Sequence, residues 1–320
     1  MKPKVYITRK LPEEVVADLY ESCQVTMWEK EEVPVPYEEL EKQVQDADGI
    51  LCLLTESIDA NLLKKSPRLK IISNMAVGYN NIDVSTAKAQ GILITNTPGV
   101  LTETTADLTF GLLIATARRF EESMDYVKKG KWATWSPMQL TGQDVYGSTL
   151  GIIGMGDIGE GIARRAKGFD MNVLYHNRSR KLKAEKELGV TYCDLQELLK
   201  QSNFVVVMTP YTPQTHHLIS YAELSLMKPT SILINTSRGG IVDEEALYEA
   251  LAEKRIWAAG LDVFEREPVS PDHPLLQLPN VVALPHIGSA SIATRTKMGK
   301  LAAHNLLEGL KGNTPPNLVL

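Results

Sequence analysis

The stretch Leu150–Gly161, which reads LGIIGMGDIGEG, constrains the fold of this chain more than any other part of its sequence. A short apolar run ends at Gly154, and a segment compatible with a helix follows Gly159. Between them lies the spacing G-x-G-x-x-G. The first glycine makes a tight turn, the second lets backbone approach a pyrophosphate, and the third lets the helix pack close to the strand.

A helix N-terminus also presents free N–H groups and the positive end of its dipole to an anion. The stretch therefore predicts a strand, a turn and a helix that bind a dinucleotide, with an unliganded glycine turn as the alternative. We expect the cofactor to contact the residues of the turn itself, which are Gly154, Met155, Gly156, Asp157, Ile158 and Gly159.

The segment after the next strand-like run indicates which dinucleotide binds. A carboxylate is expected about 20 residues after the first glycine, where it hydrogen-bonds the ribose 2′-OH of NAD. Asn177 stands near that place, followed by Arg178, Ser179 and Arg180, and this segment carries no negative charge. Guanidinium groups bind phosphates bidentately. We expect these four residues to bind NADP(H). If the cations are only solvated loop residues, NAD(H) is the alternative.

Length and composition limit the remaining classes of protein. A chain of 320 residues with 43% hydrophobic and 23% charged residues is typical of a soluble globular protein with two domains. The net charge of −5 argues against nucleic-acid binding. Cys23, Cys52 and Cys193 show neither CxxC nor Cys/His metal spacing, which predicts reduced thiols, a cytoplasmic location and no metal. No apolar run approaches about 18 residues, so no membrane span is expected.

The first hundred residues alternate strand-like and helix-like segments, which predicts an open parallel α/β sheet with ligands at the carboxyl ends of its strands. The expected strands are Val5–Thr8, Val25–Trp28, Gly49–Leu54, Leu69–Ser73 and Gly91–Thr95. The expected helices are Glu13–Ser22, Tyr37–Gln45, Ile58–Lys65 and Val84–Gln90.

Three later segments bear on how the halves of the chain are organised. Thr102–Ala117 is a long helix between the two α/β series, which we interpret as interdomain. Lys128–Val145 is a loop with Trp132 and Trp135, a composition that often marks a protein contact. Ile292–Leu310 is a terminal helix, and because the first series lacks its last helix, we expect it to cross back and pack there.

Reactive side chains follow three successive strands of the second series. Arg238 follows the first, Asp262 and Glu267 the second, and His286 the third. Parallel strands bring these ends to one edge. An arginine there can bind the carboxylate and polarise the carbonyl of a 2-keto acid, a histidine can donate the proton, and a glutamate can orient the imidazole. Taken singly, Arg238 could be a capping cation, Glu267 a surface acid before a proline turn and His286 a satisfied loop histidine.

The order and spacing of these motifs resemble those of the D-isomer-specific 2-hydroxyacid dehydrogenases. The shared motifs are GxGxxG, NTSRGG-IVDE, LDVFExEP and LPHIGSA, and they extend the resemblance over nearly the whole chain. The segments SNMAVGYNNID and NTPGVLTETTADL, with the HNRSRK loop, look most like the glyoxylate/hydroxypyruvate reductase branch. Asn177 departs from the aspartate of NAD-preferring relatives, which puts NAD preference in doubt.

The resemblance implies roles for matching positions only. Arg238, Glu267 and His286 fall at the catalytic positions. Backbone N–H groups around Ala76, Val77 and Gly78, together with Arg238, fall where the substrate carboxylate is held. Further cofactor contacts are implied at Thr105, Thr209, Pro210, Thr236, Ser237, Asp262, Gly288 and Ser289.

The same resemblance implies an α/β fold of two Rossmann-like domains with parallel sheets, one flavodoxin-like and one dinucleotide-binding. The substrate domain would be discontinuous, residues 1–100 and 288–320, around a cofactor domain of 101–287, with a hinge between them and a homodimer as the assembly. The implied reaction is NAD(P)H-dependent reduction of glyoxylate to glycolate or hydroxypyruvate to D-glycerate. Two alternatives stay open, a relative acting on 2-ketogluconate, D-lactate or phosphoglycerate and, more remotely, a dinucleotide-sensing corepressor that binds peptide partners.

Overall fold

The structure, a computed structural model, describes residues 2–319 and separates the chain into two compact units. Thr102–Ser289 forms one unit, and the other combines the chain before Thr102 with the chain after Ser289. These limits lie close to the expected domain boundaries at residues 100/101 and 287/288. Each unit has its own parallel sheet with helices on both faces, which confirms the predicted fold class.

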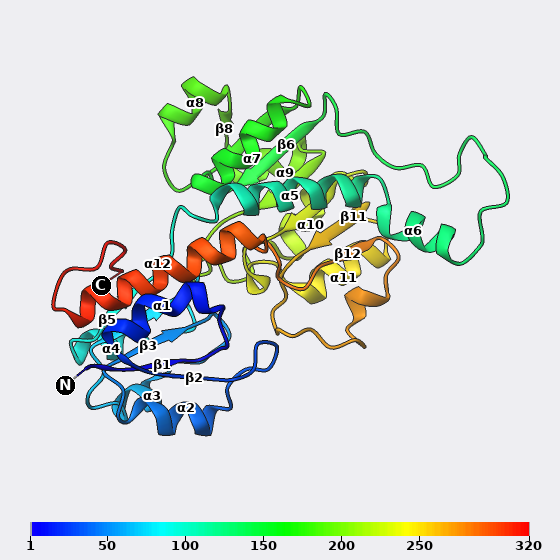
Figure 1. Ribbon diagram of the computed structural model, residues 1–320. Coiled ribbons are helices and arrows are strands. Elements are labelled where there is room, and N and C mark those ends of the chain that lie inside the picture. The colour runs from blue at the N-terminus through cyan, green and yellow to red at the C-terminus, as the bar shows by residue number, and fades with distance from the viewer. Residues whose placement is uncertain (1, 320) are drawn as a thin grey trace. The chain divides into compact units, whose positions relative to one another are not determined.

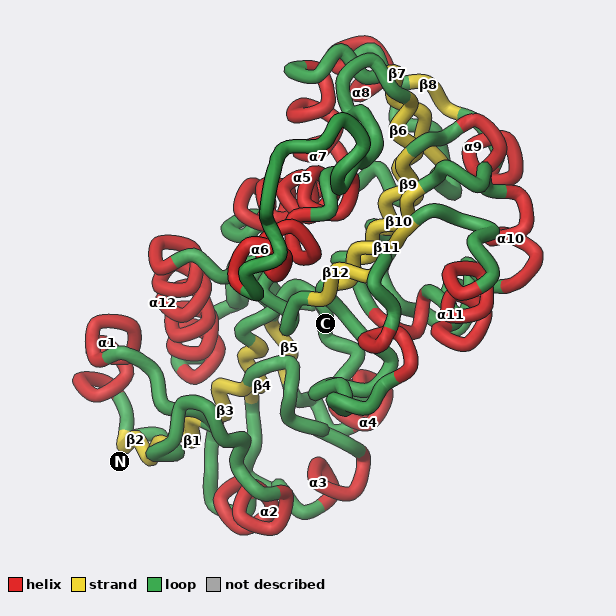
Figure 2. The backbone as a smooth tube through the Cα atoms, turned by 90° about the vertical axis from the view of Figure 1, so that its right-hand side faces the viewer, coloured by secondary structure: helices red, strands yellow, loops and turns green. Residues whose placement is uncertain are grey.

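The sheet of the first unit has the strand order β2-β1-β3-β4-β5 (Figure 2). Its strands are β1 (Lys4–Ile7), β2 (Gln24–Met27), β3 (Gly49–Cys52), β4 (Ile71–Asn74) and β5 (Leu93–Thr95), and every pair is parallel. The order reverses between β1 and β3, which is the flavodoxin-like arrangement. All four residues of β3 and of β4 are buried, as expected where helices cover both faces of a parallel sheet.

The helices that cover this sheet are α1 (Glu13–Ser22), α2 (Tyr37–Val44), α3 (Ala60–Lys64), α4 (Val84–Ala89) and α12 (Ile292–Leu310). The terminal helix α12 packs on α1 and on the central strands, as the sequence predicts (Figure 1). Ser73 of β4 donates a 2.7 Å hydrogen bond to the carbonyl of Ala302 in α12. This bond connects the N-terminal part of the chain to its terminal helix.

Helix α3 is shorter than the expected Ile58–Lys65. Asp59 is its N-cap and accepts a hydrogen bond from the backbone N–H of Leu62 at 2.8 Å, so the helix begins at Ala60. Ile58 instead forms a bridge with Ile82. The start of this helix is therefore set by the capping residue and not by the apolar pattern.

The second unit has the strand order β12-β11-β10-β9-β6-β7-β8, again all parallel (Figure 2). Its strands are β6 (Thr149–Ile153), β7 (Asn172–His176), β8 (Thr191–Tyr192), β9 (Phe204–Val207), β10 (Ile232–Asn235), β11 (Ala258–Leu261) and β12 (Val281–Ala283). The order reverses between β6 and β9. Ligands of open α/β sheets bind at such a reversal, outside the carboxyl ends of the strands.

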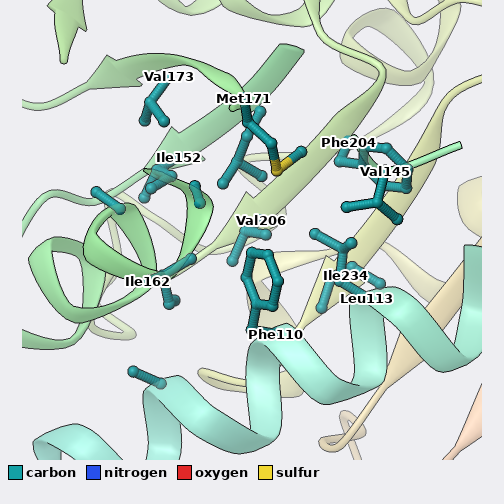
Figure 3. Close-up of a cluster of buried hydrophobic side chains, with 14 of the residues drawn as sticks. Phe110, Leu113, Val145, Ile152, Ile162, Met171, Val173, Phe204, Val206 and Ile234 are labelled. Atoms are coloured by element: carbon teal, nitrogen blue, oxygen red, sulfur yellow. The ribbon is translucent and has the colours of Figure 1, made fainter. Parts of the chain in front are cut away.

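The helices of this unit are α5 (Thr102–Ala117), α6 (Phe120–Lys128), α7 (Asp157–Lys167), α8 (Leu182–Leu188), α9 (Leu195–Gln201), α10 (Tyr221–Leu226) and α11 (Glu244–Ala252), with short 3-10 turns at Gly239–Ile241 and Pro274–Gln277. Helix α5, which we interpreted as interdomain, packs on α7 and on strands β10 to β12. Figure 3 shows Phe110 of α5 and Ile162 of α7 in one apolar cluster with Ile152 and Val206 of the sheet. Helix α5 therefore completes the core of the second unit.

Three further observations concern other classes of protein. Within residues 2–319, no helix is both long and apolar enough to cross a membrane. The same residues contain no group of three or more His, Cys, Asp or Glu side chains placed to hold a metal ion. Cys23, Cys52 and Cys193 are all free.

Candidate active site

The glycine turn joins the end of β6 to the start of α7, at the reversal of strand order. Gly154 has a φ of +108°, and a Cβ built there would lie 2.6 Å from the carbonyl of Met208. A Cβ at Gly159 would lie 2.3 Å from the carbonyl oxygen of Gly154. These two positions need glycine for the fold itself. A Cβ at Gly156, by contrast, would meet no atom within 4 Å.

The open space at Gly156 lies at the N-cap of α7, an 11-residue helix. A pyrophosphate needs such room together with the free N–H groups of the first helical turn. Thr209, which follows β9, supports the same assignment, since its Oγ1 is buried and has no hydrogen-bond partner among the described residues. The turn and its neighbours therefore fit a dinucleotide.

Asn177 lies at the end of β7 and contacts this turn directly. Its Oδ1 accepts a 2.9 Å hydrogen bond from the backbone N–H of Met155, and that donor fixes the orientation of the amide. The rest of the amide is an NH2 group, which can only donate. An aspartate in the same place would keep a second oxygen for a ribose hydroxyl, whereas this asparagine offers donors to an anion.

The three residues after Asn177 are all exposed but differ in their partners. Arg178 and Ser179 have no hydrogen bond or ion pair among the described residues. Arg180 donates to both carboxylate oxygens of Glu185, with distances of 3.0 Å from Nε and 2.5 Å from Nη2. The segment itself carries no negative charge, as stated above, but Glu185, five residues further on, brings a carboxylate against it that was not expected.

The carboxyl ends of β10, β11 and β12 carry the predicted catalytic residues. These strands are neighbours in the sheet, and Arg238, Glu267 and His286 follow them in that order. Nδ1 of His286 lies 2.6 Å from Oε2 of Glu267. Since an ionised carboxylate can only accept, Nδ1 is the donor, and Nε2 is the ring nitrogen left for a ligand.

Glu267 is held on both of its oxygens. Oε1 accepts a 3.0 Å hydrogen bond from the backbone N–H of Phe264, while Oε2 accepts the bond from His286. Burial raises the pKa of Glu267, but the bond from His286, the N–H of Phe264 and the charge of Arg238 together bring it below its usual value. The carboxylate of Glu267 therefore stays ionised at neutral pH.

Arg238 is half-buried, and its Nη1 donates to the carbonyl of Ser237 at 2.7 Å. Burial lowers the pKa of its guanidinium, opposed by the negative charge of Glu267. Gly239 has a structural role that was not predicted from the sequence. A Cβ there would lie 1.9 Å from the backbone carbon of Phe264, so only glycine lets the Arg238 loop lie against the loop that carries Glu267. The double glycine after Arg238 was the available signal.

Asp262 holds the loop that carries His286. Its two oxygens accept hydrogen bonds from the backbone N–H groups of Ile287 and Gly288, both at 2.8 Å, next to a His286 backbone with a φ of +55°. Burial raises the pKa of Asp262, and the bonds from Ile287 and Gly288 oppose that shift. Thr105 is another position assigned to the cofactor, and it lies beside Gly288. A Cβ built at Gly288 would be 3.4 Å from the methyl group of Thr105.

Thr236 and Ser237 are buried and already have partners. Oγ1 of Thr236 shares a 2.7 Å hydrogen bond with Thr109, and Oγ of Ser237 donates to the side chain of Asn235. Pro210 is exposed and Ser289 is half-buried. The structure therefore places these four residues at the strand ends without assigning them a ligand.

The residues expected to hold a substrate carboxylate lie in the first unit, after β4. The N–H of Ala76 donates to the carbonyl of Asn74 at 2.8 Å and is not free. The N–H groups of Val77 and Gly78 have no partner within residues 2–319. Asn74 fixes this turn, since its Nδ2 donates to the carbonyl of Gly78 at 2.9 Å.

A dinucleotide turn at the reversal of a parallel sheet, with a His–Glu pair and a half-buried arginine at neighbouring strand ends, defines an oxidoreductase that uses a nicotinamide dinucleotide. Residues 110–288 match the family model described as D-isomer specific 2-hydroxyacid dehydrogenase, NAD binding domain. The chain belongs to this family, in its glyoxylate reductase branch, and is an oxidoreductase that acts on CH–OH groups.

Similarity to individual proteins extends over the full chain. A glyoxylate reductase of Korarchaeum cryptofilum is 51% identical over all of this chain and 96% of its own length. One from Thermococcus onnurineus is 50% identical with the same coverage. Among solved structures, an NADPH-dependent glyoxylate/hydroxypyruvate reductase of Sinorhizobium meliloti, in complex with NADP and malonate, is 34% identical, with a TM-score of 0.87 over 100% of this chain and 97% of that one.

Proposed function

We propose that this enzyme reduces glyoxylate to glycolate and hydroxypyruvate to D-glycerate, with NADPH as the reductant. The observation that carries the proposal is the His286–Glu267 pair at 2.6 Å, on strand ends next to that of Arg238. Relatives named glyoxylate reductase, about half identical over the whole chain, support this choice of substrates.

In this proposal each side chain at the strand ends has a separate chemical role. Bound NADPH supplies the hydride that reaches the carbonyl carbon of the keto acid. Arg238 binds the carboxylate of the keto acid and polarises its carbonyl. Nε2 of protonated His286 donates a proton to the carbonyl oxygen, and ionised Glu267 stabilises the charged imidazole.

Absorbance at 340 nm, followed with glyoxylate and hydroxypyruvate and with NADPH and NADH in parallel, tests the proposal. We expect rapid oxidation of NADPH with either acid and slower oxidation of NADH. Pyruvate, 2-ketogluconate and phosphohydroxypyruvate extend the panel to the other substrates considered. Absence of turnover with every acid and both cofactors would overturn the proposal and favour a dinucleotide-sensing binding protein.

The amide of Asn177 and the cations after it support the preference for NADPH. Replacing Asn177 with Asp is expected to reverse that preference, because the new carboxylate repels a 2′-phosphate and can accept from a ribose hydroxyl. The change in the ratio of kcat/KM for NADPH and NADH should be about tenfold or more, which corresponds to about 1.4 kcal/mol. Asn172, at the exposed start of β7, provides a matched Asn→Asp control. An unchanged ratio in the Asn177 variant would contradict this role.

We also propose that the enzyme assembles as a homodimer through α6 and the loop after it. Their large apolar side chains are exposed, with Trp135 at 76% and Met138 at 77%, and no residue of α6 is buried. Contiguous exposed apolar residues are typical of protein contacts. Light scattering of the intact protein should give twice the mass of the 35.4 kDa chain, and a monomer would contradict this assembly.

A further inference from the structure

Glu185 of α8 is a mostly buried carboxylate with several hydrogen-bond partners and not an isolated surface charge. Only 18% of its side chain is exposed, and its Oε1 accepts a 2.7 Å hydrogen bond from the hydroxyl of the fully buried Tyr175. The same hydroxyl accepts the backbone N–H of Lys181 at 2.6 Å. One tyrosine therefore fixes both the carboxylate and the end of the loop that follows β7.

This carboxylate takes up one edge of the Arg180 guanidinium. Nε and Nη2 both donate to Glu185, and Cζ lies 5.9 Å from the centre of the Tyr192 ring. A guanidinium binds a carboxylate or a phosphate best through two parallel N–H bonds, so the edge held by Glu185 is closed to a second anion. Arg178 has no such partner among the described residues.

We propose that Glu185 is a specificity-determining residue that weakens the binding of a 2′-phosphate, by pairing with Arg180 and by placing a fixed negative charge beside it. The inference rests on the proposed binding of NADP(H) by this loop. The net charge of the Arg180–Glu185 pair is zero, so Arg178 and the donors of Ser179 and Asn177 supply the attraction for the phosphate. Glu185 would thereby narrow the difference in affinity between NADPH and NADH.

The experiment measures calorimetric affinities of the full chain for adenosine 2′,5′-bisphosphate and for 5′-AMP, which differ only in the 2′-phosphate. Glu185→Gln removes the charge and keeps an oxygen that can accept from Tyr175. We expect this variant to bind the bisphosphate roughly three- to tenfold more tightly, with unchanged affinity for 5′-AMP. Glu187→Gln, an exposed residue of the same helix, is the matched control and should change neither affinity.

An unchanged or weaker affinity of Glu185→Gln for the bisphosphate would overturn the inference, the weaker one by indicating that Glu185 orients Arg180 for the phosphate. The wild-type protein tests the proposed function separately. If the wild-type protein binds both nucleotides equally, the proposed preference for NADPH is wrong. The change in affinity for the bisphosphate caused by Glu185→Gln still tests the role of Glu185 separately.

Discussion

Replacing His286 with Asn is expected to lower kcat by about 10²- to 10⁴-fold, the usual contribution of a general acid. Asparagine suits the test because it tolerates the positive φ of this position better than most residues, so the loop held by Asp262 should keep its shape. The variant should bind NADPH as the wild type does, since the glycine turn is untouched. Steady-state kinetics and a cofactor titration measure the two effects separately.

The pH profile distinguishes loss of the proton donor from loss of folding. Glu267, with its pKa below the usual value, stays ionised across the neutral range. A general acid must be protonated to act, so we expect a fall in kcat with rising pH in the wild type and its absence from the residual activity of His286→Asn. His304→Asn, at an exposed site on α12, is the control. A kcat within a few-fold of wild type in His286→Asn would remove His286 from the mechanism.

Replacing Arg238 with Gln is expected to lower kcat/KM by about 10²- to 10³-fold, comparable to the loss of one donor aimed at a developing oxyanion. Glutamine keeps one NH2 group as a donor but carries no charge and cannot form the two parallel bonds of a guanidinium to a carboxylate. Kinetics with glyoxylate, over a range wide enough to separate kcat from KM, provide the measurement.

Two comparisons sharpen the Arg238 experiment. Arg118→Gln, an exposed arginine just after α5, should leave kcat/KM unchanged. Arg238→Lys restores the charge but not the bidentate geometry and should recover only part of the loss. If Arg238→Gln raises the Kd for NADPH as much as it lowers kcat/KM, the guanidinium serves the cofactor and not the keto acid.

Much of the fold follows from patterns that act over short stretches. The apolar strands, the glycine turn and the terminal helix Ile292–Leu310 are all where the sequence predicts them. Local sequence patterns predict a helix less well where the helix buries no side chain in a core. Helix α6 buries no residue, and only its apolar spacing at Phe120, Met124 and Val127 could have indicated a helix.

The candidate site also has a part that the sequence predicts and a part that it does not. Strand order brings Arg238, Glu267 and His286 to adjacent ends. The α/β alternation predicts that these ends share one edge of a parallel sheet, although it does not determine the order of the strands. Two details depend on packing between segments far apart or on the path of a turn, so the sequence analysis missed them. One is the contact of Gly239 with the backbone of Phe264, and the other is the return of α8 that sets Glu185 against Arg180.

The open space at Gly156 separates folding from ligand recognition at a single backbone position. With a φ of −89° and no atom within 4 Å of its missing Cβ, this residue can carry a Cβ without backbone strain or collision inside the protein. The methyl groups of a valine there would occupy the volume that a pyrophosphate requires. A Gly156→Val enzyme should therefore melt at the wild-type temperature without cofactor yet gain no thermal stability from added NADPH, and so provide a permanently empty reference form of the protein.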